Sequence, residues 1–543
     1  MDLQEYVITL KNKEDLNNFY DDLETFGGSE FIPERCVECS NRREISRNTH
    51  YYLTENESNL LKNDERVLDV IPLSEINLIE KKPLYTQFSD NWSKSSTIVN
   101  THRNWGLLRC TLSEQISNWG SNGTSNQSGT IQVTSSGKNV DVVIVDGHLD
   151  PNHPEFSVNS DGTGGTRVIQ YNWYQHTNEL GLGSNGTYQY PTGSSLLNGD
   201  DNHGMHVAGT VIGNSQGWAR DANIYNISPY SSNPNTLAGD YTFDYIRAFH
   251  RNKSINPLTG RKNPTICNNS WGSYYSITRS TITNVNWRGN NYTSNFTDSN
   301  LTSYGLLDFT STILYISAWT TSLVVDIEDT INDGIILIGA AGNESTKIDS
   351  FGGQDYNNSI TWSGVTRNYH RGSWNITGSN AICVGAISAL TNESKATFSN
   401  CGPRVDVYSP GVNIISSLHT SGGGVTLVND FRNSSYKLGK YQGTSMASPQ
   451  VCGVIACLLE QYPRMTQSEI LNYISFHSKK NKITDTGGSY SDSTSLQGSG
   501  NNFLYYNKER KEQGIILPKF SEKLRPSTGQ VYPRNNITLY KNQ

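Results

Sequence analysis

Residues 141–146 read Asp-Val-Val-Ile-Val-Asp, four successive branched apolar side chains between two carboxylates. A strand that is apolar on both faces is typical of a parallel sheet buried beneath helices on either side. Similar apolar runs occur at Ile335–Ile338 and Ile382–Val384. These runs predict a mainly parallel sheet. The carboxylate that ends the first run lies where such sheets carry their functional sites, at the carboxyl ends of the strands.

Stretches with helical spacing lie between these strands. Apolar residues recur with a helical period in His206–Ile212, Ser322–Asp333 and Met446–Gln461. Strands that alternate with helices predict an α/β fold of three layers, in which helices cover both faces of a mainly parallel central sheet. Two stretches rich in Asn, Ser, Thr, Tyr and Gly, 159–202 and 273–320, are expected to be insertions on the surface.

The first 83 residues show a pattern of their own. Strand-like and helical stretches follow in a β-α-β-β-α-β-like order, which predicts a small α+β domain over 1–83. The stretches that carry this order are Tyr6–Leu10, Lys13–Thr25, Tyr51–Leu53, Glu57–Lys62 and Val67–Leu73. A polar linker is expected over 84–104, the α/β domain over 105–483, and a polar C-terminal extension over 484–543.

Composition argues against several classes of protein. Of the 543 residues 34% are apolar, and the net charge of −7 is spread without a basic block, so nucleic acid is not an expected partner. No apolar run approaches the roughly 20 residues that span a bilayer, so no membrane is expected either. Asp2 and Glu5 follow Met1 where a secretory signal would be basic and apolar. We expect no signal peptide, and an intracellular, lysis-released or virion-associated location stays open. The eight scattered cysteines are expected to be reduced thiols.

Ser445 is the candidate nucleophile. It lies in Gly443-Thr-Ser-Met-Ala-Ser-Pro449, at the start of a helix that is apolar on nearly every face and therefore belongs in the centre of a protein. A side chain in that first turn lies at the positive end of the helix dipole, beside backbone N–H groups. An isolated serine before a helix is more often its cap, but Thr444 is available as the cap and would leave Ser445 free.

A serine hydroxyl needs a base within hydrogen-bond reach, and the base needs a group that orients it. His203, in His203-Gly-Met-His206, offers the base, and Asp146 at the end of its strand offers the carboxylate. Taken singly, the aspartate could be a helix cap and the histidine a loop residue. Taken together, the three residues follow the order Asp, His, Ser, which one class of serine protease uses.

Four blocks of the sequence resemble those of the subtilases, a family of serine proteases. They are Val143-Ile-Val-Asp146 with His153-Pro-Glu-Phe156 after it, His203-Gly-Met-His-Val-Ala-Gly209, Ala340-Ala-Gly-Asn-Glu344 and Gly443-Thr-Ser-Met-Ala-Ser-Pro449. The resemblance runs from about Trp105 to Lys480, and four blocks in the correct order make chance agreement remote. It implies a subtilisin-like fold and a serine endopeptidase with Asp146, His203 and Ser445 as its catalytic triad.

The resemblance assigns further residues. Asn343 is the implied oxyanion donor, which suits a side-chain amide with small neighbours, and it would act with the backbone N–H of Ser445. Asn268-Asn-Ser-Trp-Gly272 is similar to the substrate-binding strand of the family, where an exposed edge would pair with an extended polypeptide. The implied substrate-binding residues are Ser270, Trp271, Gly272, Ala340, Ala341 and Gly342. Trp271 could equally be a core residue.

The N-terminal unit resembles the inhibitory propeptide of the family. We expect it to cover the cleft, to assist folding and to be removed between about Lys81 and His102, so that the chain is a self-processing zymogen. Its expected partners are polypeptide substrates and its own propeptide; the alternative is a permanent appendage. No cofactor is required. The resemblance admits calcium, with Glu155 or Asp150 as oxygen ligands, although no compact loop supports a metal site.

Three departures from the family pattern keep another function open. Gly147 and His148 follow Asp146 where the family has Ser or Thr and then Gly, and Met205 replaces the usual Thr between the two histidines. None removes a reacting atom, but they leave open a catalytically weak or inactive relative that serves as a structural or binding protein. An esterase is disfavoured, because Ala447 stands where the esterase motif needs Gly.

Overall fold

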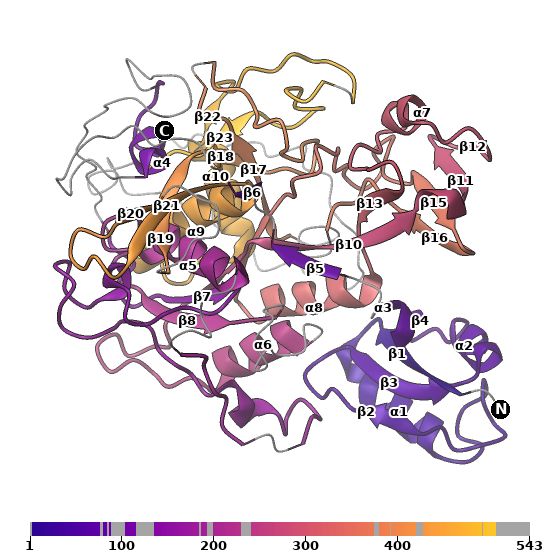
Figure 1. The fold of residues 1–543 in the computed structure, drawn as a ribbon. Helices are drawn as coiled ribbons and strands as arrows, with labels where there is room; N and C mark the ends of the chain where they lie inside the picture. Colours follow the sequence, from indigo (N-terminus) through magenta and orange to yellow (C-terminus); the bar gives the residue numbers. More distant parts are fainter. Residues whose placement is uncertain are drawn as a thin grey trace, which may run out of the picture.

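The computed structural model describes residues 3–76, 80–83, 86–87, 104–115, 135–183, 186–192, 199–229, 241–373, 380–390, 392–419, 427–490 and 492–506. Within them a single large sheet forms the centre of the main body (Figure 1). Its strands are β7 (Asp141–Val145), β8 (Asn223–Ile227), β9 (Thr265–Asn269), β14 (Ile336–Ala340), β17 (Ile382–Ile387), β18 (Val407–Pro410), β22 (Lys479–Lys480) and β23 (Asn502–Phe503). The order is β22-β23-β18-β17-β14-β9-β7-β8, and every pair but β22–β23 is parallel.

Helices cover both faces of this sheet. One face carries α5 (Gly199–Ile212), α9 (Thr444–Gln461) and α10 (Gln467–His477), and the other carries α6 (Thr242–Asn252) and α8 (Thr321–Asn332). The side chains of β7 alternate between two cores: Val142 and Ile144 pack with α5 and α9, whereas Val143 and Val145 pack with α6 and α8. The predicted three-layer α/β fold is therefore confirmed, because four apolar residues in a row need an apolar partner on each face.

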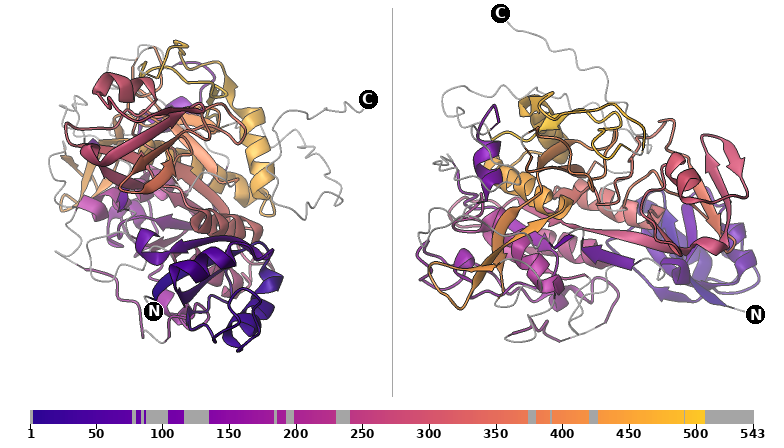
Figure 2. Two further views of the ribbon diagram at one scale, coloured as in Figure 1. Left: turned by 90° about the vertical axis from the view of Figure 1, so that its right-hand side faces the viewer. Right: turned by 45° about the horizontal axis from the view of Figure 1, so that its top comes forward.

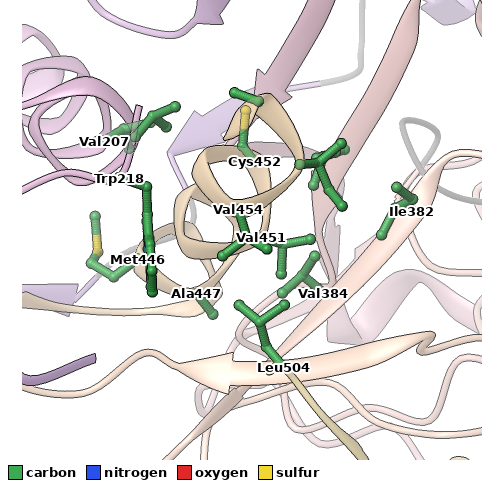
Figure 3. Close-up of a cluster of buried hydrophobic side chains, with 14 of the residues drawn as sticks. Val207, Trp218, Ile382, Val384, Met446, Ala447, Val451, Cys452, Val454 and Leu504 are labelled. Atoms are coloured by element: carbon green, nitrogen blue, oxygen red, sulfur yellow. The ribbon is translucent and has the colours of Figure 1, made fainter. Parts of the chain in front are cut away.

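Helix α9 occupies the middle of the larger core. All residues from Thr444 to Leu459 are buried, as the all-round apolar sequence predicts. Figure 3 shows Met446, Ala447 and Val451 of this helix among side chains from other elements, including Val207 of α5 and Val384 of β17. The helix is enclosed on every side, so its first turn is held at a defined place near the carboxyl ends of the strands.

The N-terminal residues form a unit with a core of its own. Its elements are β1 (Gln4–Leu10), a 3-10 turn (Lys13–Asp15), α1 (Leu16–Glu24), β2 (Cys39–Asn41), β3 (Asn48–Leu53), α2 (Glu55–Leu61), β4 (Val67–Pro72) and α3 (Leu73–Ile76). The antiparallel sheet has the order β2-β3-β1-β4. Ile8, Phe19, Tyr51 and Leu61 are among the side chains of its separate apolar cluster. The predicted small α+β fold is seen here.

The N-terminal unit packs against α6 and α8 of the main body (Figures 1 and 2). The guanidinium of Arg43 lies between two carboxylates, with Nη2 at 2.6 Å from Oδ2 of Asp244 and at 3.0 Å from Oδ2 of Asp326. Asn48 donates to the carbonyl of Ser322 over 3.0 Å, and Arg47 pairs with Asp329. These contacts are polar, and those of Arg43 and Asn48 are buried, so they fix how the unit sits on the two helices.

The region around the predicted insertion at 273–320 forms a lobe. Its elements are β10 (Trp271–Thr278), a 3-10 turn (Arg279–Thr281), β11 (Ile282–Trp287), β12 (Asn290–Tyr292), α7 (Asp298–Ser303), β13 (Ile313–Ser317), β15 (Ser359–Trp362) and β16 (Val365–Asn368). Tyr275, Val285, Leu314 and Ile360 belong to an apolar cluster within it. This lobe is therefore packed around its own core rather than being a set of loops, and strand β10 joins it to the main body.

Shorter elements complete the described chain. They are α4 (Trp105–Cys110), the 3-10 turns Pro154–Phe156 and Trp173–His176, β19 (Ile414–Leu418), β20 (Leu427–Asn429), β21 (Lys437–Gln442), β5 (Glu80–Pro83) and β6 (Thr86–Gln87). Phe503, Leu504 and Tyr506 belong to the main core, so the packed body continues past the boundary predicted near Thr484. Most of the predicted linker and the chain after residue 506 lie outside the described residues. All eight cysteines are free thiols, and none of the described helices has the length and apolarity to cross a bilayer.

Candidate active site

Asp146 and His203 meet in a fully buried pair. Asp146 follows the last residue of β7, and His203 lies in α5, which begins at Gly199 rather than at the predicted His206. The carboxylate of Asp200, in its first turn, suits the positive end of the helix dipole. The predicted start was wrong because it was based on the spacing of apolar residues, which does not include this polar first turn. Nδ1 of His203 lies 2.7 Å from Oδ1 of Asp146, and both side chains are 0% exposed. Because a carboxylate only accepts, Nδ1 carries the proton and Nε2 is left as the basic nitrogen.

The second histidine of α5, His206, has a different role. Nε2 of His206 lies 2.8 Å from the carbonyl of Ile414, and its ring stacks on Tyr441 with centroids 4.7 Å apart. Burial lowers the pKa of His206 to about 3, so the ring is neutral, and it ties α5 to the paired strands β19 and β21. His203, which faces Asp146, is the histidine placed to act as a base.

Ser445 lies in the first turn of α9. The helix begins at Thr444 with Gly443 as its N-cap, so the predicted capping role of Thr444 is wrong. The Thr444 hydroxyl instead donates to Oδ1 of Asn343 and accepts from the N–H of Gly342, over 2.9 and 3.1 Å. Oγ of Ser445 donates to the carbonyl of Ser270 over 2.7 Å, and Oγ of Ser270 donates back to the Ser445 carbonyl over 2.9 Å. This reciprocal pair joins the helix start to the end of β9.

Asn343 lies beside this turn with its amide oriented. Its Oδ1 accepts from the backbone N–H and from the hydroxyl of Thr444, each over 2.9 Å. With the carbonyl end of the amide held in this way, its NH₂ group points to the opposite side. Asn343 is half-buried, so it remains within reach of a ligand at this edge of the sheet.

The residues predicted to bind substrate lie at neighbouring strand ends. Ser270 and Gly272 flank Trp271, whose side chain is completely buried in the core with α6 and α8, so it can offer a substrate only its backbone. A Cβ at position 272 would lie 2.6 Å from Oγ of Ser373, which explains the glycine. Ala340 ends β14, and Ala341 and Gly342 lead from it to Asn343.

Two short strands flank the first turn of α9. Strand β5 pairs antiparallel with β10, with Pro83 opposite Trp271 and Lys82 opposite Gly272. Strand β6 pairs antiparallel with β21, with Thr86 opposite Gln442. Figure 1 shows β5, in the indigo of the N-terminal residues, beside β10 in the main body. Strands β5 and β6 therefore pair with strands that adjoin Ser270 and Gly443 in sequence, the residues beside Ser445.

The departures after Asp146 are accommodated by local packing. A Cβ at Gly147 would lie 1.9 Å from the carbonyl oxygen of Asp200, so close approach to α5 requires glycine here. His148 is fully buried: its backbone N–H donates to Oδ1 of Asp201 over 2.8 Å, and its Nε2 lies 2.9 Å from the hydroxyl of Tyr188. Met205 accepts the N–H of Asp150 on its sulfur over 3.1 Å.

The two candidate calcium ligands are engaged by other side chains of the protein. Glu155 pairs with Arg432 and accepts the N–H groups of Ser215 and Gln216 over 2.9 and 3.0 Å, and Asp150 lies 3.1 Å from Nε2 of His419. Burial alone would raise the pKa of Glu155, but the guanidinium and these donors lower it below its usual value. A cation at Glu155 would meet Arg432, so this carboxylate does not fit calcium. Within the described ranges no three acidic, histidine or cysteine side chains converge on one point.

Comparisons of this chain with a family model and with known sequences lead to the same family. The model of the subtilase family matches residues 137–500. Subtilisin E of Bacillus subtilis (strain 168) is 25% identical over 340 residues, covering 62% of this chain and 59% of its own length. A thermostable alkaline protease of Halalkalibacterium halodurans is 31% identical over 172 residues, covering 31% of this chain and 33% of its own length. This chain thus spans less than two thirds of subtilisin E.

A solved structure supports the fold. Fervidolysin from Fervidobacterium pennivorans, described as a keratinolytic enzyme related to subtilisin, matches with a TM-score of 0.50 and 17% identity. The match covers 93% of this chain and 60% of that one. At this identity the likeness concerns the fold, which agrees with the three-layer architecture described above.

Proposed function

The chain belongs to the subtilase family of serine proteases, and from this premise we propose that it is a serine endopeptidase that uses Asp146, His203 and Ser445. The observation that carries the proposal is the 2.7 Å contact between His203 Nδ1 and Asp146 Oδ1, both fully buried. A histidine held in this tautomer has its other nitrogen ready to take a proton. Ser445, in the first turn of α9, carries the hydroxyl that the family pattern assigns as the partner of this nitrogen.

The chemistry is acyl transfer in two steps. Ser445 attacks a peptide carbonyl while its proton passes to Nε2 of His203, and the imidazolium then protonates the leaving amine. Asp146 stabilises the imidazolium without taking its proton. Water, activated by the same histidine, attacks the acyl-enzyme and releases the second product. In the structure the Ser445 hydroxyl donates to the carbonyl of Ser270, so it must turn toward Nε2 of His203 before the first proton transfer.

The oxyanion of the tetrahedral intermediate requires donors that are already oriented. The NH₂ group of Asn343 and the backbone N–H of Ser445 are the two candidates. The hydrogen bonds from Thr444 to Oδ1 of Asn343 support this assignment, because they fix the orientation of the amide group. Substrates are expected to be extended polypeptides that add a strand to β10 where β5 now pairs.

Labelling with a fluorophosphonate probe tests the triad. We expect the probe to react with Ser445 and to fail in Ser445→Ala and in His203→Ala. Ser448→Ala is a matched control, because Ser448 lies one turn further along α9 and donates to Asn268. Labelling that persists in Ser445→Ala, or a wild-type protein that neither labels nor cleaves any peptide, would instead support an inactive relative with a binding role.

We propose further that the N-terminal unit is a propeptide removed by the same site. Strands β5 and β6 pair on either side of Ser445, and each pairing is antiparallel, as for a bound substrate. We expect the cut to fall between Pro83, the last residue of β5, and Thr86, the first residue of β6. The residues between these strands lie outside the described part of the chain.

Mass spectrometry of the purified protein tests this processing. We expect the mature N-terminus of the wild type to lie between residues 84 and 86, and we expect an uncut chain in Ser445→Ala. A wild-type chain that stays uncut while it hydrolyses peptides would make the N-terminal unit a permanent appendage. Cleavage of Ser445→Ala at the same bond would show that another protease is responsible.

A further inference from the structure

Asn400 holds the loop that carries Asn343. It is completely buried, and it lies in the segment that follows β17, far from the loop in sequence. Its Oδ1 accepts the backbone N–H groups of Glu344 and Thr346 over 3.2 and 2.8 Å. Its Nδ2 donates to the carbonyl of Ala341 over 2.9 Å and to Oε2 of Glu344 over 2.6 Å.

Glu344 completes the arrangement on the other side. Its Oε1 accepts the backbone N–H of Asn343 over 2.9 Å, so the peptide that bears the candidate oxyanion donor is bound directly by this carboxylate. The backbone N–H of Asn400 also donates to the carbonyl of Gly342 over 2.9 Å. Every hydrogen-bonding group of the Asn400 side chain is therefore used, and each partner belongs to residues 341–346.

The loop needs this support because its backbone is unusual. Gly342 has φ +110°, a conformation that L residues rarely adopt, and a Cβ there would lie 2.3 Å from Nδ2 of Asn400 and 2.5 Å from Oε2 of Glu344. Ser345, three residues on, has φ +57°. Such backbone conformations cost free energy and persist only where the surroundings hold them.

We propose that Asn400, acting through Glu344, is a positioning residue for the oxyanion donor Asn343. Thr444 fixes the amide of Asn343 from the α9 side, whereas Asn400 and Glu344 fix its backbone from the β17 side. A donor must lie within a few tenths of an ångström of where the oxyanion forms, so loss of either support lowers transition-state binding more than substrate binding. The proposal rests on the endopeptidase function proposed above.

A double-mutant cycle with Asn343 gives the decisive kinetic test. In the wild-type background we expect Asn400→Ala to lower kcat by roughly 10- to 100-fold, a part of the 10²–10³ that one oxyanion donor supplies, with KM changed by less than about threefold. In an Asn343→Ala background the same substitution should lower kcat by less than about threefold, because the donor it positions is gone. Equal losses in both backgrounds overturn the proposal.

The charge variant Asn400→Asp supplies a second readout. It keeps an oxygen that accepts the backbone N–H groups of Glu344 and Thr346. It also replaces the amide that donates to the Glu344 side chain with a second carboxylate. Tyr274 of β10 and Asp308 lie near the same Glu344 carboxyl group. Two carboxylates at this distance share a proton, so the ratio of variant to wild-type kcat should rise as the pH falls. A ratio that does not change with pH counts against the proposal.

A control separates positioning from general stability. Asn358 is an equally buried asparagine whose Oδ1 accepts the N–H of Arg288 and whose Nδ2 donates to Asp355, away from the catalytic residues. Asn358→Ala should lower the thermal midpoint while leaving kcat within about twofold of the wild type. Its effect should be the same in both backgrounds.

Hydrogen exchange tests whether Asn400 supports the loop, and this measurement does not require an active enzyme. In Ser445→Ala protein, Asn400→Ala should speed exchange of the amides of residues 343–346, and Asn358→Ala should not. Unchanged protection of this loop overturns the positioning role. If the wild type is inactive while Asn400→Ala still loosens the loop, the endopeptidase proposal has failed and the support of the loop by Asn400 stands.

Discussion

Among single residues, Asp146 has the most specific task. We predict that Asp146→Asn lowers kcat by about 10⁴ while the protein keeps its fold, because an amide can donate to Nδ1 and so favours the wrong histidine tautomer. Steady-state kinetics on an extended peptide, together with circular dichroism of the variant, measures this. A loss of less than tenfold would mean that the buried contact between His203 and Asp146 does not orient the base.

Glu344 makes a prediction about stability and pH. Burial raises the pKa of Glu344 to about 7, against an ordinary value of 4.5. An acid whose pKa is raised by folding binds its proton more tightly in the folded state, so its stabilising effect is complete below about pH 4.5 and is lost as the pH rises through about 7. The shift corresponds to about 3 kcal/mol. Unfolding free energies of Ser445→Ala protein should therefore fall over this range, and Glu344→Gln should remove that part of the fall.

Among the elements, the β20–β21 hairpin is held to the turn after β7 by a buried ion cluster. Arg432 pairs with Glu155 and lies 2.6 Å from Asp430, and all three side chains are at most 3% exposed. Removing the cation leaves two buried carboxylates without a partner. We predict that Arg432→Met lowers the free energy of unfolding by about 3–5 kcal/mol.

An exposed ion pair serves as the comparison for this cluster. Arg279 lies 2.7 Å from Asp298, whose side chain is 69% exposed. Asp298→Asn should cost less than about 1 kcal/mol, because water screens the pair. Chemical denaturation of both variants in the Ser445→Ala protein compares them, and similar losses would show that the hairpin is held by its apolar contacts. A chelator should leave the stability of the Glu155 region unchanged, since Arg432 supplies its positive charge.

For the molecule as a whole, the contact between its N-terminal unit and main body depends on Arg43. Its guanidinium is 3% exposed and lies between Asp244 and Asp326. In Arg43→Met the buried Asp326 would lose its cation and Asp244 would be left with its 3.5 Å contact with Arg247, which favours separation of the two parts. We predict that α6 and α8 lose protection from hydrogen exchange in the Arg43→Met, Ser445→Ala protein. Arg35→Met, which breaks an ion pair with Glu57 inside the N-terminal unit, should leave both helices protected.

The order of layers and the position of the main side chains follow from local patterns. Residues 142–145, an uninterrupted apolar run, and the helix after Ser445, apolar on nearly every face, are buried as their sequences predict. Such patterns work because a period of apolar side chains reports how many faces of one element are covered. The family blocks add Asp146, His203, Ser445 and Asn343 as candidates, and the structure brings Asp146 to His203 and Thr444 to Asn343.

Other features depend on neighbours that are distant in sequence. Asn400 supports a loop more than fifty residues away, Arg432 pairs with Glu155, which was a possible calcium ligand, and Trp271 turns its ring into the core. Neither period nor composition registers such contacts, because a hydrogen bond or an ion pair between loops exists only once the sheet has set the distance between them. The sequence by itself determined the layers of the fold. The partners of the buried polar groups were decided only by the packing of one layer against the next.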